Sequence, residues 1–499
     1  MVSYKTRVVE LPDLAQQNPW WRNPKALEED LTLRELYGQE VRWSPRLFHR
    51  FQLSRDRVYT LRGPRQVGKT TLAKLLIQDL IQDRGVDPRA VLYYSCDLVR
   101  DSRDLADVVE TFLRWQAPFE LPRRYLFLDE VSSVKEWGVA FRALANRGHL
   151  LSTTAVLTGS HALDVARQVE RLPGRRGEAN RPEREDPLDK VQLPMKFSEY
   201  AETLDEEVRM VLISAGLLDD QERLARFDDL FEGRGSAAWS SILALQGPLQ
   251  RLLQDYLLTG GFPRPLNDLR RRERIERETY ELYVRAVTGD LARWGLDERT
   301  ARELLAATAD RLGTPFSWRT LARETDIGSH NTVSRYVQAL EQSYVLQTVY
   351  HYDRRRKRRA PRKDRKLYVS DPFMFHALRG WASGLPDPFK EAKAFLEDPK
   401  QRGPLLEAVL ADHLARLAFA ALPSSLFEAY EHVFYWRSRK GWEVDFVVRP
   451  GSRTRALQVT TTRPRTETSR ALRSFGGGLV VTETGERTSV PLACILLLI

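Results

Sequence analysis

The sequence predicts an α/β protein whose core is a parallel sheet with helices on both faces. Four short apolar runs alternate with two helical patterns, the runs at 58–61, 90–95, 125–130 and 153–158 and the helices at 71–77 and 104–115. Strands that alternate with helices in this way are typical of a parallel sheet. A glycine-rich loop directly after the first run is the second indication, because such loops join a strand to a helix at the carboxyl edge of these sheets.

This loop is Gly63-Pro64-Arg65-Gln66-Val67-Gly68-Lys69-Thr70, and it fits the pattern G-x-x-x-x-G-K-[ST]. The glycines let backbone N–H groups point inward at phosphates, and Lys69 is expected to reach the β- and γ-phosphates. The Thr70 hydroxyl is expected to ligate Mg²⁺, and Thr71 opens the helix that follows. The sequence therefore predicts a P-loop that binds ATP and Mg²⁺.

Two acids end the third apolar run. We expect Asp129 to hold Mg²⁺ together with Thr70, and Glu130 to polarise the water that attacks the γ-phosphate. The fourth run ends in Thr158, with Ser160 two residues later. Either hydroxyl is in position to sense the γ-phosphate, and a strand-end hydroxyl without that role is the alternative. An extra strand between the P-loop and the acids resembles the ATPase class with an additional catalytic Glu.

Composition limits the classes of protein. With 499 residues the chain is long enough for three or four domains, and 42% hydrophobic and 29% charged residues are typical of a folded globular protein. The two cysteines lie in apolar runs, which disfavours disulfides and metal clusters. No apolar run approaches 18 residues and no signal-peptide layout is present, so we expect a cytoplasmic protein with no membrane partner.

Residues 163–192 are polar and rich in Arg, Glu and Pro. Arg175 or Arg176 is a candidate arginine finger that reaches the γ-phosphate of a neighbouring subunit, which would require a homo-oligomer. A solvated loop is the alternative. The first 50 residues, with Asn18-Pro19-Trp20-Trp21, predict an arm that packs on the core, and a position near the adenine is the other possibility.

From about 200 to 310 the pattern is helical, with a break at Gly260-Gly261-Phe262-Pro263. The segment Gly261-Phe262-Pro263 resembles the Gly-x-Pro motif in the lid of signal-transducing P-loop ATPases. In that motif the proline touches the nucleotide, so the resemblance makes Pro263 a candidate nucleotide contact. A plain turn between two helices is the alternative.

A helix-turn-helix pattern follows at 317–340, and two strand patterns at 345–349 and 366–370 bracket a basic run. This order predicts a winged helix. Asn331, Ser334 and Arg335 are candidate DNA contacts on the second helix. The wing candidates for phosphate contact are Arg354, Arg355, Arg356, Lys357, Arg358 and Arg359, and much of the net charge of +10 lies there. Winged helices also dock proteins, which is the alternative.

The segment after about 386 contains a helical pattern at 403–413 and strand patterns at 432–436, 443–448 and 456–460. Its order resembles the PD-(D/E)XK nuclease-like fold, in which Glu407 and Asp445 match motif acids. Gln458 and Thr460 stand where the motif has its second acid and its lysine, so nuclease activity is not expected. The run 492–499 is predicted to be a last buried strand.

Taken in order, these motifs resemble the prokaryotic AAA-type ATPases with a C-terminal nuclease-like domain, close to the archaeal-type signal-transducing ATPases. The resemblance spans about residues 45–490. With the N-terminal arm expected at 1–50, it implies a P-loop ATPase core (51–200), a helical lid (201–305), a winged helix with a basic wing (306–385) and a nuclease-like α/β domain (386–499).

The expected function is ATP hydrolysis coupled to binding, translocation or remodelling of duplex, single-stranded or branched DNA. Lys69, Asp129, Glu130, Thr158 and Arg175 are the candidate catalytic residues. Two alternatives remain open: a switch ATPase that acts on protein partners, and a metal-dependent nuclease effector.

Overall fold

The computed structural model describes residues 9–160, 187–421, 428–450, 453–460, 466–485 and 489–499. The chain divides into two compact units, unit 1 (Met1–Leu193) and unit 2 (Pro194–Ile499). Within the described ranges, no helix is long and apolar enough to cross a lipid bilayer.

Unit 1 is built on a parallel sheet of five strands in the order β2-β3-β4-β1-β5. Its strands are β1 (Arg57–Arg62), β2 (Val91–Ser95), β3 (Arg124–Asp129), β4 (Thr153–Gly159) and β5 (Asp189–Val191). Its helices are α1 (Leu11–Gln17), α2 (Leu31–Tyr37), α3 (Lys69–Gln78), α4 (Ser102–Gln116) and α5 (Trp137–Asn146). The predicted strands and helices are all present.

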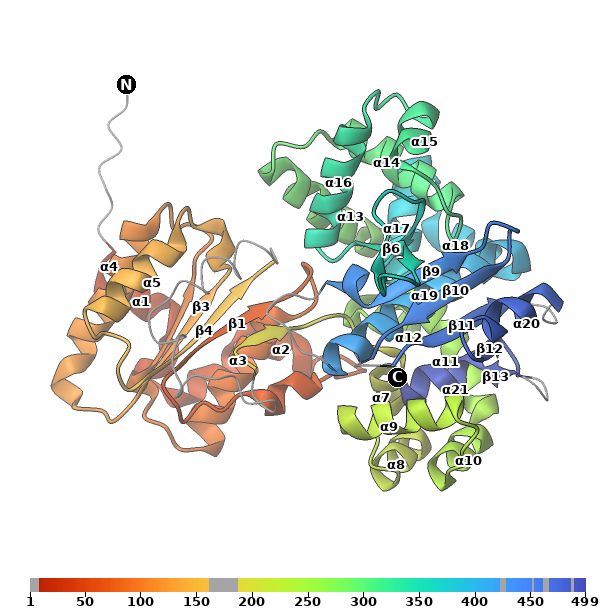
Figure 1. Cartoon of the computed structure of the whole chain (residues 1–499). Coiled ribbons are helices and arrows are strands. Elements are labelled where there is room, and N and C mark those ends of the chain that lie inside the picture. Colours follow the sequence, from red (N-terminus) through yellow and green to blue (C-terminus); the bar gives the residue numbers. More distant parts are fainter. Residues whose placement is uncertain (1–8, 161–186, 422–427, 451–452, 461–465, 486–488) are drawn as a thin grey trace. The chain divides into compact units, whose positions relative to one another are not determined.

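Apolar side chains pack on both faces of this sheet, with α4 and α5 on one side and α3 on the other (Figure 1). Strand residues alternate between the two faces: Leu126 and Leu128 pack under α4 and α5, whereas Tyr125 and Phe127 pack under α3. This alternation follows from the two-residue period of a strand. The predicted α/β fold class with helices on both faces is confirmed.

The N-terminal arm covers the free edge of the sheet. The Asn18 side chain donates to the carbonyl of Tyr93 (2.8 Å) and accepts from its N–H (2.7 Å). Both Trp20 and Trp21 donate from Nε1 to the carbonyl of Val91. β2 is an end strand of the sheet, so these contacts satisfy backbone groups that would otherwise be available to another chain.

Unit 2 begins with helices and continues into a mixed sheet. Its helices are α7 (Phe197–Leu204), α8 (Glu206–Ser214), α9 (Asp220–Phe231), α10 (Ala237–Ala244), α11 (Gln246–Thr259), α12 (Pro263–Arg272), α13 (Arg277–Arg293), α14 (Glu298–Asp310), α15 (Trp318–Glu324), α16 (His330–Gln342), α17 (Pro372–Ser383), α18 (Pro388–Glu397), α19 (Pro399–Ala421), α20 (Thr466–Arg473) and α21 (Leu492–Leu498). Its strands are β6 (Leu346–Asp353), β7 (Arg358–Arg359), β8 (Arg365–Val369), β9 (Val433–Arg437), β10 (Glu443–Val448), β11 (Arg455–Thr460), β12 (Leu479–Thr482) and β13 (Val490–Pro491).

Strand β6 connects two parts of unit 2 that are distant in sequence. It pairs antiparallel with β8, forming the hairpin around the basic run, and parallel with β9 through Tyr350 and His351. The sheet then continues in the order β9-β10-β11-β12-β13. The hairpin and the C-terminal strands are therefore one continuous sheet.

The terminal run that the sequence predicts as a strand is a helix instead. Every residue of α21 is buried, and α21 contacts α7, α9, α10 and α11. A short run that is apolar throughout has no periodicity to distinguish a buried strand from a buried helix. The surrounding helices of unit 2, which sequence alone does not place, provide the packing for a helix.

Candidate functional site

The predicted P-loop lies between β1 and α3. The backbone requires glycine at its start, because a Cβ on Gly63 would lie 1.9 Å from the carbonyl oxygen of Gln192. Gly68 has φ 92° and precedes the first residue of α3, Lys69. The N–H groups of that helix end point into the loop, which is the arrangement that binds phosphate.

Lys69 lies inside the loop and is buried. Its ammonium donates to the carbonyls of Gly63 (3.0 Å) and Pro64 (2.9 Å). Among the other loop residues, Val67 is buried, Arg65 is partly buried and Gln66 is exposed. Gln192, which follows β5, closes the loop by donating from Nε2 to the carbonyl of Val67 (2.9 Å). Sequence reasoning did not identify Gln192, because it lies more than 120 residues downstream of the loop.

Asp129 ends β3 and is surrounded by hydroxyl groups. Its Oδ2 accepts from Thr70 Oγ1 at 2.7 Å and from the Tyr93 hydroxyl at 3.0 Å. Its Oδ1 accepts from Thr158 Oγ1. The structure thus brings together Thr70, Asp129 and Thr158, which the sequence proposed for one centre.

Glu130 lies beside this centre with φ 54°, in the left-handed region that is uncommon for a residue with a side chain. Its N–H donates to Thr158 Oγ1 (2.8 Å), and its Oε1 accepts from the hydroxyls of Ser160 (2.7 Å) and Ser132 (3.1 Å). Thr158 therefore contacts both acids through Asp129 Oδ1 and the Glu130 N–H, while Ser160 holds the Glu130 carboxylate.

Burial disfavours the ionised form of Glu130, but the attraction of the Lys69 ammonium and the Ser160 hydrogen bond outweigh it. The pKa of Glu130 consequently lies below its ordinary value of 4.5. Arg65 and Ser132 contribute in the same direction. At neutral pH this side chain is a carboxylate that can accept a proton.

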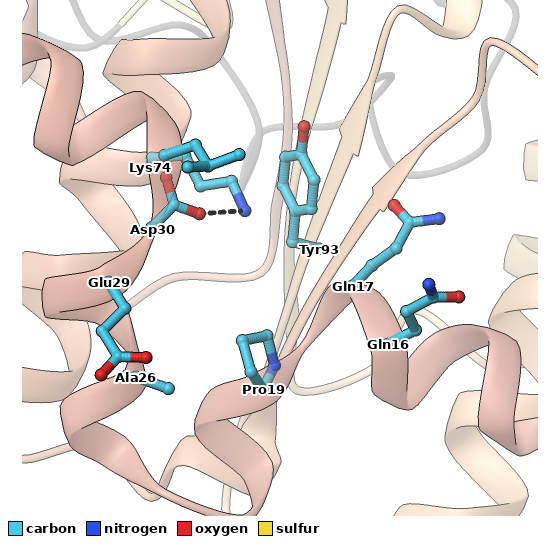
Figure 2. Close-up of a pocket in the computed structure, with 9 residues that line it drawn as sticks. Gln16, Gln17, Pro19, Ala26, Glu29, Asp30, Lys74 and Tyr93 are labelled. Atoms are coloured by element: carbon cyan, nitrogen blue, oxygen red, sulfur yellow. Dashed lines mark ion pairs between the residues drawn. The ribbon is translucent and has the colours of Figure 1, made fainter.

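A second group of side chains includes Lys74, Tyr93 and residues of the N-terminal arm (Figure 2). The Lys74 ammonium lies 3.1 Å from Asp30 and 3.5 Å from the centre of the Tyr93 ring. Burial lowers the pKa of Lys74, and the Asp30 carboxylate opposes that shift. A cavity of about 360 Å³ lies here, lined by Gln16, Gln17, Pro19, Ala26, Glu29, Asp30, Leu31, Lys74 and Tyr93.

Sequence reasoning missed Tyr93 as part of the centre. A usable signal was present: Tyr93 lies on β2, the strand next to β3, two residues before Ser95, which pairs with Asp129. Strand side chains of adjacent parallel strands meet at the carboxyl edge of the sheet. A tyrosine there is close enough to donate to an acid at the end of the neighbouring strand.

Arg175 and its alternative Arg176 fall outside the described residues. Pro263 is the first residue of α12, and the two glycines before it are explained by packing within unit 2. A Cβ on Gly261 would lie 2.1 Å from the carbonyl oxygen of Met195. The Gly261 N–H donates to the buried Asp371 carboxylate at 2.8 Å. Contact between Pro263 and a nucleotide stays a prediction.

In unit 2, Asn331 and Arg335 are exposed on α16 and Ser334 is partly buried. The residues from Arg354 to Arg358 are exposed, whereas Arg359 is partly buried and lies 3.3 Å from Glu431. Arg365 and Lys366, which belong to the same basic run in sequence, are buried. The run thus separates into an exposed loop and two residues of β8 that face inward.

Lys366 lies among carboxylates of the C-terminal strands. Its Nζ is 2.9 Å from Glu443, 3.4 Å from Asp445 and 3.5 Å from Glu407, and its side chain is only 1% exposed. Gln458 donates to Asp445, and the Tyr368 hydroxyl donates to Glu407 at 3.0 Å. We call these side chains the lysine-filled centre: Lys366, Tyr368, Glu407, Glu443, Asp445 and Gln458.

The structure brings Glu407 and Asp445 together, as the sequence predicts, but it adds Lys366 and Glu443, which the sequence analysis did not assign to this centre. Burial raises the pKa of Glu407 and of Asp445 above their ordinary values, and the Lys366 ammonium opposes both shifts. Within the described part of the chain, no group of three or more His, Cys, Asp or Glu side chains is arranged to hold a metal ion.

Two family models match parts of the chain. Residues 55–201 match a family described as an AAA domain, and residues 250–384 match a domain of unknown function. An uncharacterised protein of Haemophilus influenzae is 22% identical over 335 residues, which covers 65% of this chain and 70% of that protein.

The solved structures that match include two ATPase-related proteins. A Walker-type ATPase of Pyrococcus abyssi matches with a TM-score of 0.38 and 11% identity, covering 74% of this chain and 97% of the other. The ORC1 protein of Aeropyrum pernix in complex with DNA matches with a TM-score of 0.29 and 15% identity, with the same coverage of 74% and 97%. Both TM-scores are too low to establish a shared fold. The family match and the loop geometry instead identify residues 55–201 as a P-loop ATPase domain of the AAA type.

Proposed function

We propose that this protein is a Mg²⁺-dependent ATPase that couples its nucleotide state to the binding and remodelling of DNA. One observation carries the hydrolytic part: Asp129 accepts from the hydroxyls of Thr70 and Thr158, and the ionised Glu130 lies beside it. The loop N–H groups and Lys69 would hold the β- and γ-phosphates. The carbonyls of Gly63 and Pro64 are the present partners of Lys69, and phosphate oxygens would replace them.

The residues present fit Mg²⁺. The Thr70 hydroxyl and the Asp129 carboxylate are in direct contact, and Mg²⁺ prefers oxygen donors of these two types. When bound, the ion would neutralise charge on the phosphates. The Asp129 carboxylate accepts hydrogen bonds from the neutral hydroxyl groups of Thr70, Tyr93 and Thr158. At these contacts a metal ion would therefore not have to break an ion pair to bind it.

Glu130 would act as the base that takes a proton from the attacking water. Its carboxylate accepts from the hydroxyl of Ser160, the residue directly after β4. A change at the γ-phosphate would therefore reach Glu130 through Thr158 and Ser160. Thr158 is the sensor in this proposal. If subunits share sites, Arg175 remains the candidate finger residue from a neighbouring copy.

The DNA part rests on the hairpin β6–β8 and the helices before it. Helices α14, α15 and α16 followed by this hairpin have the order of a winged helix. The exposed loop from Arg354 to Arg358 would contact phosphates, and Asn331 and Arg335 on α16 are exposed to reach DNA. Since no base contact can be assigned, we propose duplex, single-stranded and branched DNA alike as partners.

The nuclease alternative is disfavoured by Lys366. An ammonium group lies between Glu407, Glu443 and Asp445, where a hydrolytic metal ion would need those carboxylates as ligands. We therefore assign no hydrolysis of DNA to the lysine-filled centre. The C-terminal strands serve instead as a support for the hairpin with which they share a sheet.

The decisive experiment compares ATP turnover by wild type and Glu130→Gln, with and without single-stranded, duplex and branched DNA at two salt concentrations. The proposal requires turnover that is lost in Glu130→Gln while ATP is still bound, and that rises severalfold with at least one DNA. Turnover that is indifferent to every DNA would remove the DNA part. Turnover that survives Glu130→Gln would remove the assignment of the base.

A switch that acts on protein partners is the second candidate, and one observation favours it. Helices α8 and α10 contact each other and leave large apolar side chains exposed, among them Met210, Ile213 and Leu243. Exposed apolar groups that gather on one surface are typical of protein contacts. Slow ATP turnover that no DNA stimulates would support this candidate. It also requires that a protein bound by wild type is no longer bound by the double variant Met210→Ser/Ile213→Ser.

A further inference from the structure

A second basic segment lies beside the hairpin loop. The segment Arg437-Ser438-Arg439-Lys440-Gly441-Trp442 runs from the last residue of β9 to the turn before β10, and Arg437, Arg439 and Lys440 are exposed. It is some 80 residues from the hairpin loop in sequence, and neither the sequence pattern nor the proposed function uses it.

The topology of the sheet brings the two segments together. β6 and β9 are parallel neighbours, paired at Tyr350 with Phe434 and at His351 with Tyr435. Parallel strands end at the same edge of a sheet, about 4.8 Å apart. The loop that follows β6 and the loop that follows β9 therefore leave the sheet side by side, within one Debye length of each other.

Specific contacts fix this arrangement. The Arg354 guanidinium lies 5.6 Å from the centre of the Trp436 ring and 4.7 Å from that of Phe475. The Arg449 guanidinium donates to the carbonyl of Lys357 at 2.6 Å. His351 Nε2 lies 3.1 Å from the carbonyl oxygen of Arg437. The first loop is thus held against β9 and against Arg449, the residue after β10, while His351 of β6 contacts the first residue of the second segment.

The side chains at the tips are cationic and exposed. Within the described part of the chain, Arg355, Arg356, Arg439 and Lys440 form no ion pair. The one acid in the first loop region, Asp353, accepts from the backbone N–H groups of Arg355 and Arg356 at 3.0 Å. Arg437 does pair, at 3.8 Å from Glu443, so we leave it out of the binding group.

We propose that the two loops form one phosphate-binding surface, with Arg355, Arg356, Lys357 and Arg358 from the first and Arg439 and Lys440 from the second. Its partner is the phosphate backbone of DNA, because clustered unpaired arginines and lysines neutralise phosphates without reading bases. The inference rests on the proposed DNA-binding function and extends it to residues of the C-terminal strands. A single loop would contact fewer phosphates than the two together.

The test measures the affinity of the full chain for labelled duplex DNA between about 50 and about 200 mM salt. Three double variants are compared: Arg355→Ser/Arg356→Ser, Arg439→Ser/Lys440→Ser, and a control with equal charge loss, Arg277→Ser/Arg285→Ser, on the exposed face of α13. Each loop variant should weaken binding and lower the slope of log affinity against log salt by about 2, since each phosphate contact contributes about 1. The control should bind as wild type does.

The possible results distinguish a surface made of one loop from a protein that does not bind DNA. If Arg355→Ser/Arg356→Ser weakens binding while Arg439→Ser/Lys440→Ser matches the control, the second loop is not part of the surface and DNA binding still stands. If wild type binds no DNA even at the lowest salt, the DNA part of the proposed function fails and the inference fails with it. Thermal unfolding of each variant checks that its fold is intact.

Discussion

Buried carboxyl groups occur in two centres of this protein, and the groups that contact them differ in charge. In unit 1, Asp129 is met by the hydroxyls of Thr70, Tyr93 and Thr158. In unit 2, Glu407, Glu443 and Asp445 surround the ammonium of Lys366. Hydroxyl donors orient a carboxylate and leave its charge for an added cation, whereas a buried ammonium neutralises it from within. The comparison predicts that only the first centre depends on added metal.

The largest effect is expected in the first centre. Glu130→Gln removes the base and should lower ATP turnover by about 10²–10⁴-fold, with ATP binding retained because the P-loop is untouched. Turnover is measured at saturating ATP and Mg²⁺, and binding with a fluorescent nucleotide. Glu136→Gln, at an exposed position just beyond the centre, is the matched control and should turn over as wild type does. Equal turnover in both variants would contradict the assignment.

Lys366→Met should destabilise the protein, because it leaves the three acids of the lysine-filled centre without the ammonium group that they share. Removing one member of a buried charge cluster costs about 3–5 kcal/mol, measured as the free energy of unfolding in urea. Lys363→Met, an exposed lysine of the same hairpin, should change stability by no more than about 0.5 kcal/mol. A Lys366→Met protein as stable as this control would show that the ammonium does not hold the centre together.

A smaller effect is expected for Tyr93→Phe, which removes one of the donors to Asp129 and leaves the ring that Lys74 contacts. A hydrogen bond to a charged group contributes about 1.5–3 kcal/mol. We expect a higher Mg²⁺ concentration for half-maximal turnover, with the maximal rate less affected. Tyr125→Phe, another buried tyrosine of this sheet, is the control. Identical Mg²⁺ dependence in the two variants would exclude Tyr93 from the centre.

A further effect concerns pH. Burial raises the pKa of Glu407 above 4.5, so the folded state holds this proton more tightly than the unfolded state. The contribution of Glu407 to the free energy of unfolding is therefore fully present below about pH 4.5. As pH rises toward the folded pKa this contribution is lost, by at most about 1.4 kcal/mol per pH unit. Glu407→Gln should become more stable relative to wild type as pH increases, as measured by urea unfolding at several pH values. A constant difference would contradict the pKa shift.

Much of the first centre was predictable because its parts are close in sequence or at strand ends. Thr70 and Lys69 follow one glycine, and Asp129 and Glu130 end one strand, so local pattern alone places them. Tyr93 and Gln192 were missed because their roles depend on which strands are neighbours. Strand order is set by packing of the whole sheet, which no short pattern records.

The lysine-filled centre was harder to predict from the sequence than the first centre. Lys366 belongs to a run of basic residues, and local composition gives no reason to separate it from exposed Lys363. Its burial follows from pairing of β8 with β6 and of β6 with β9, which brings residues 40 to 80 positions apart in sequence into contact. The helix at 492–498 was predicted as a strand for a related reason, since its partners are helices distant in sequence.

The double pairing of β6 also has a mechanical consequence. A pull on the basic loop along the strand axis acts on the hydrogen bonds between β6 and β9 at the same time, because the two strands would have to slide past each other. Bonds loaded together in shear resist far more force than bonds opened one after another. A DNA strand held at this loop would therefore be anchored to the whole sheet, and any tension in it would be carried by the C-terminal half of unit 2 and not by a free hairpin.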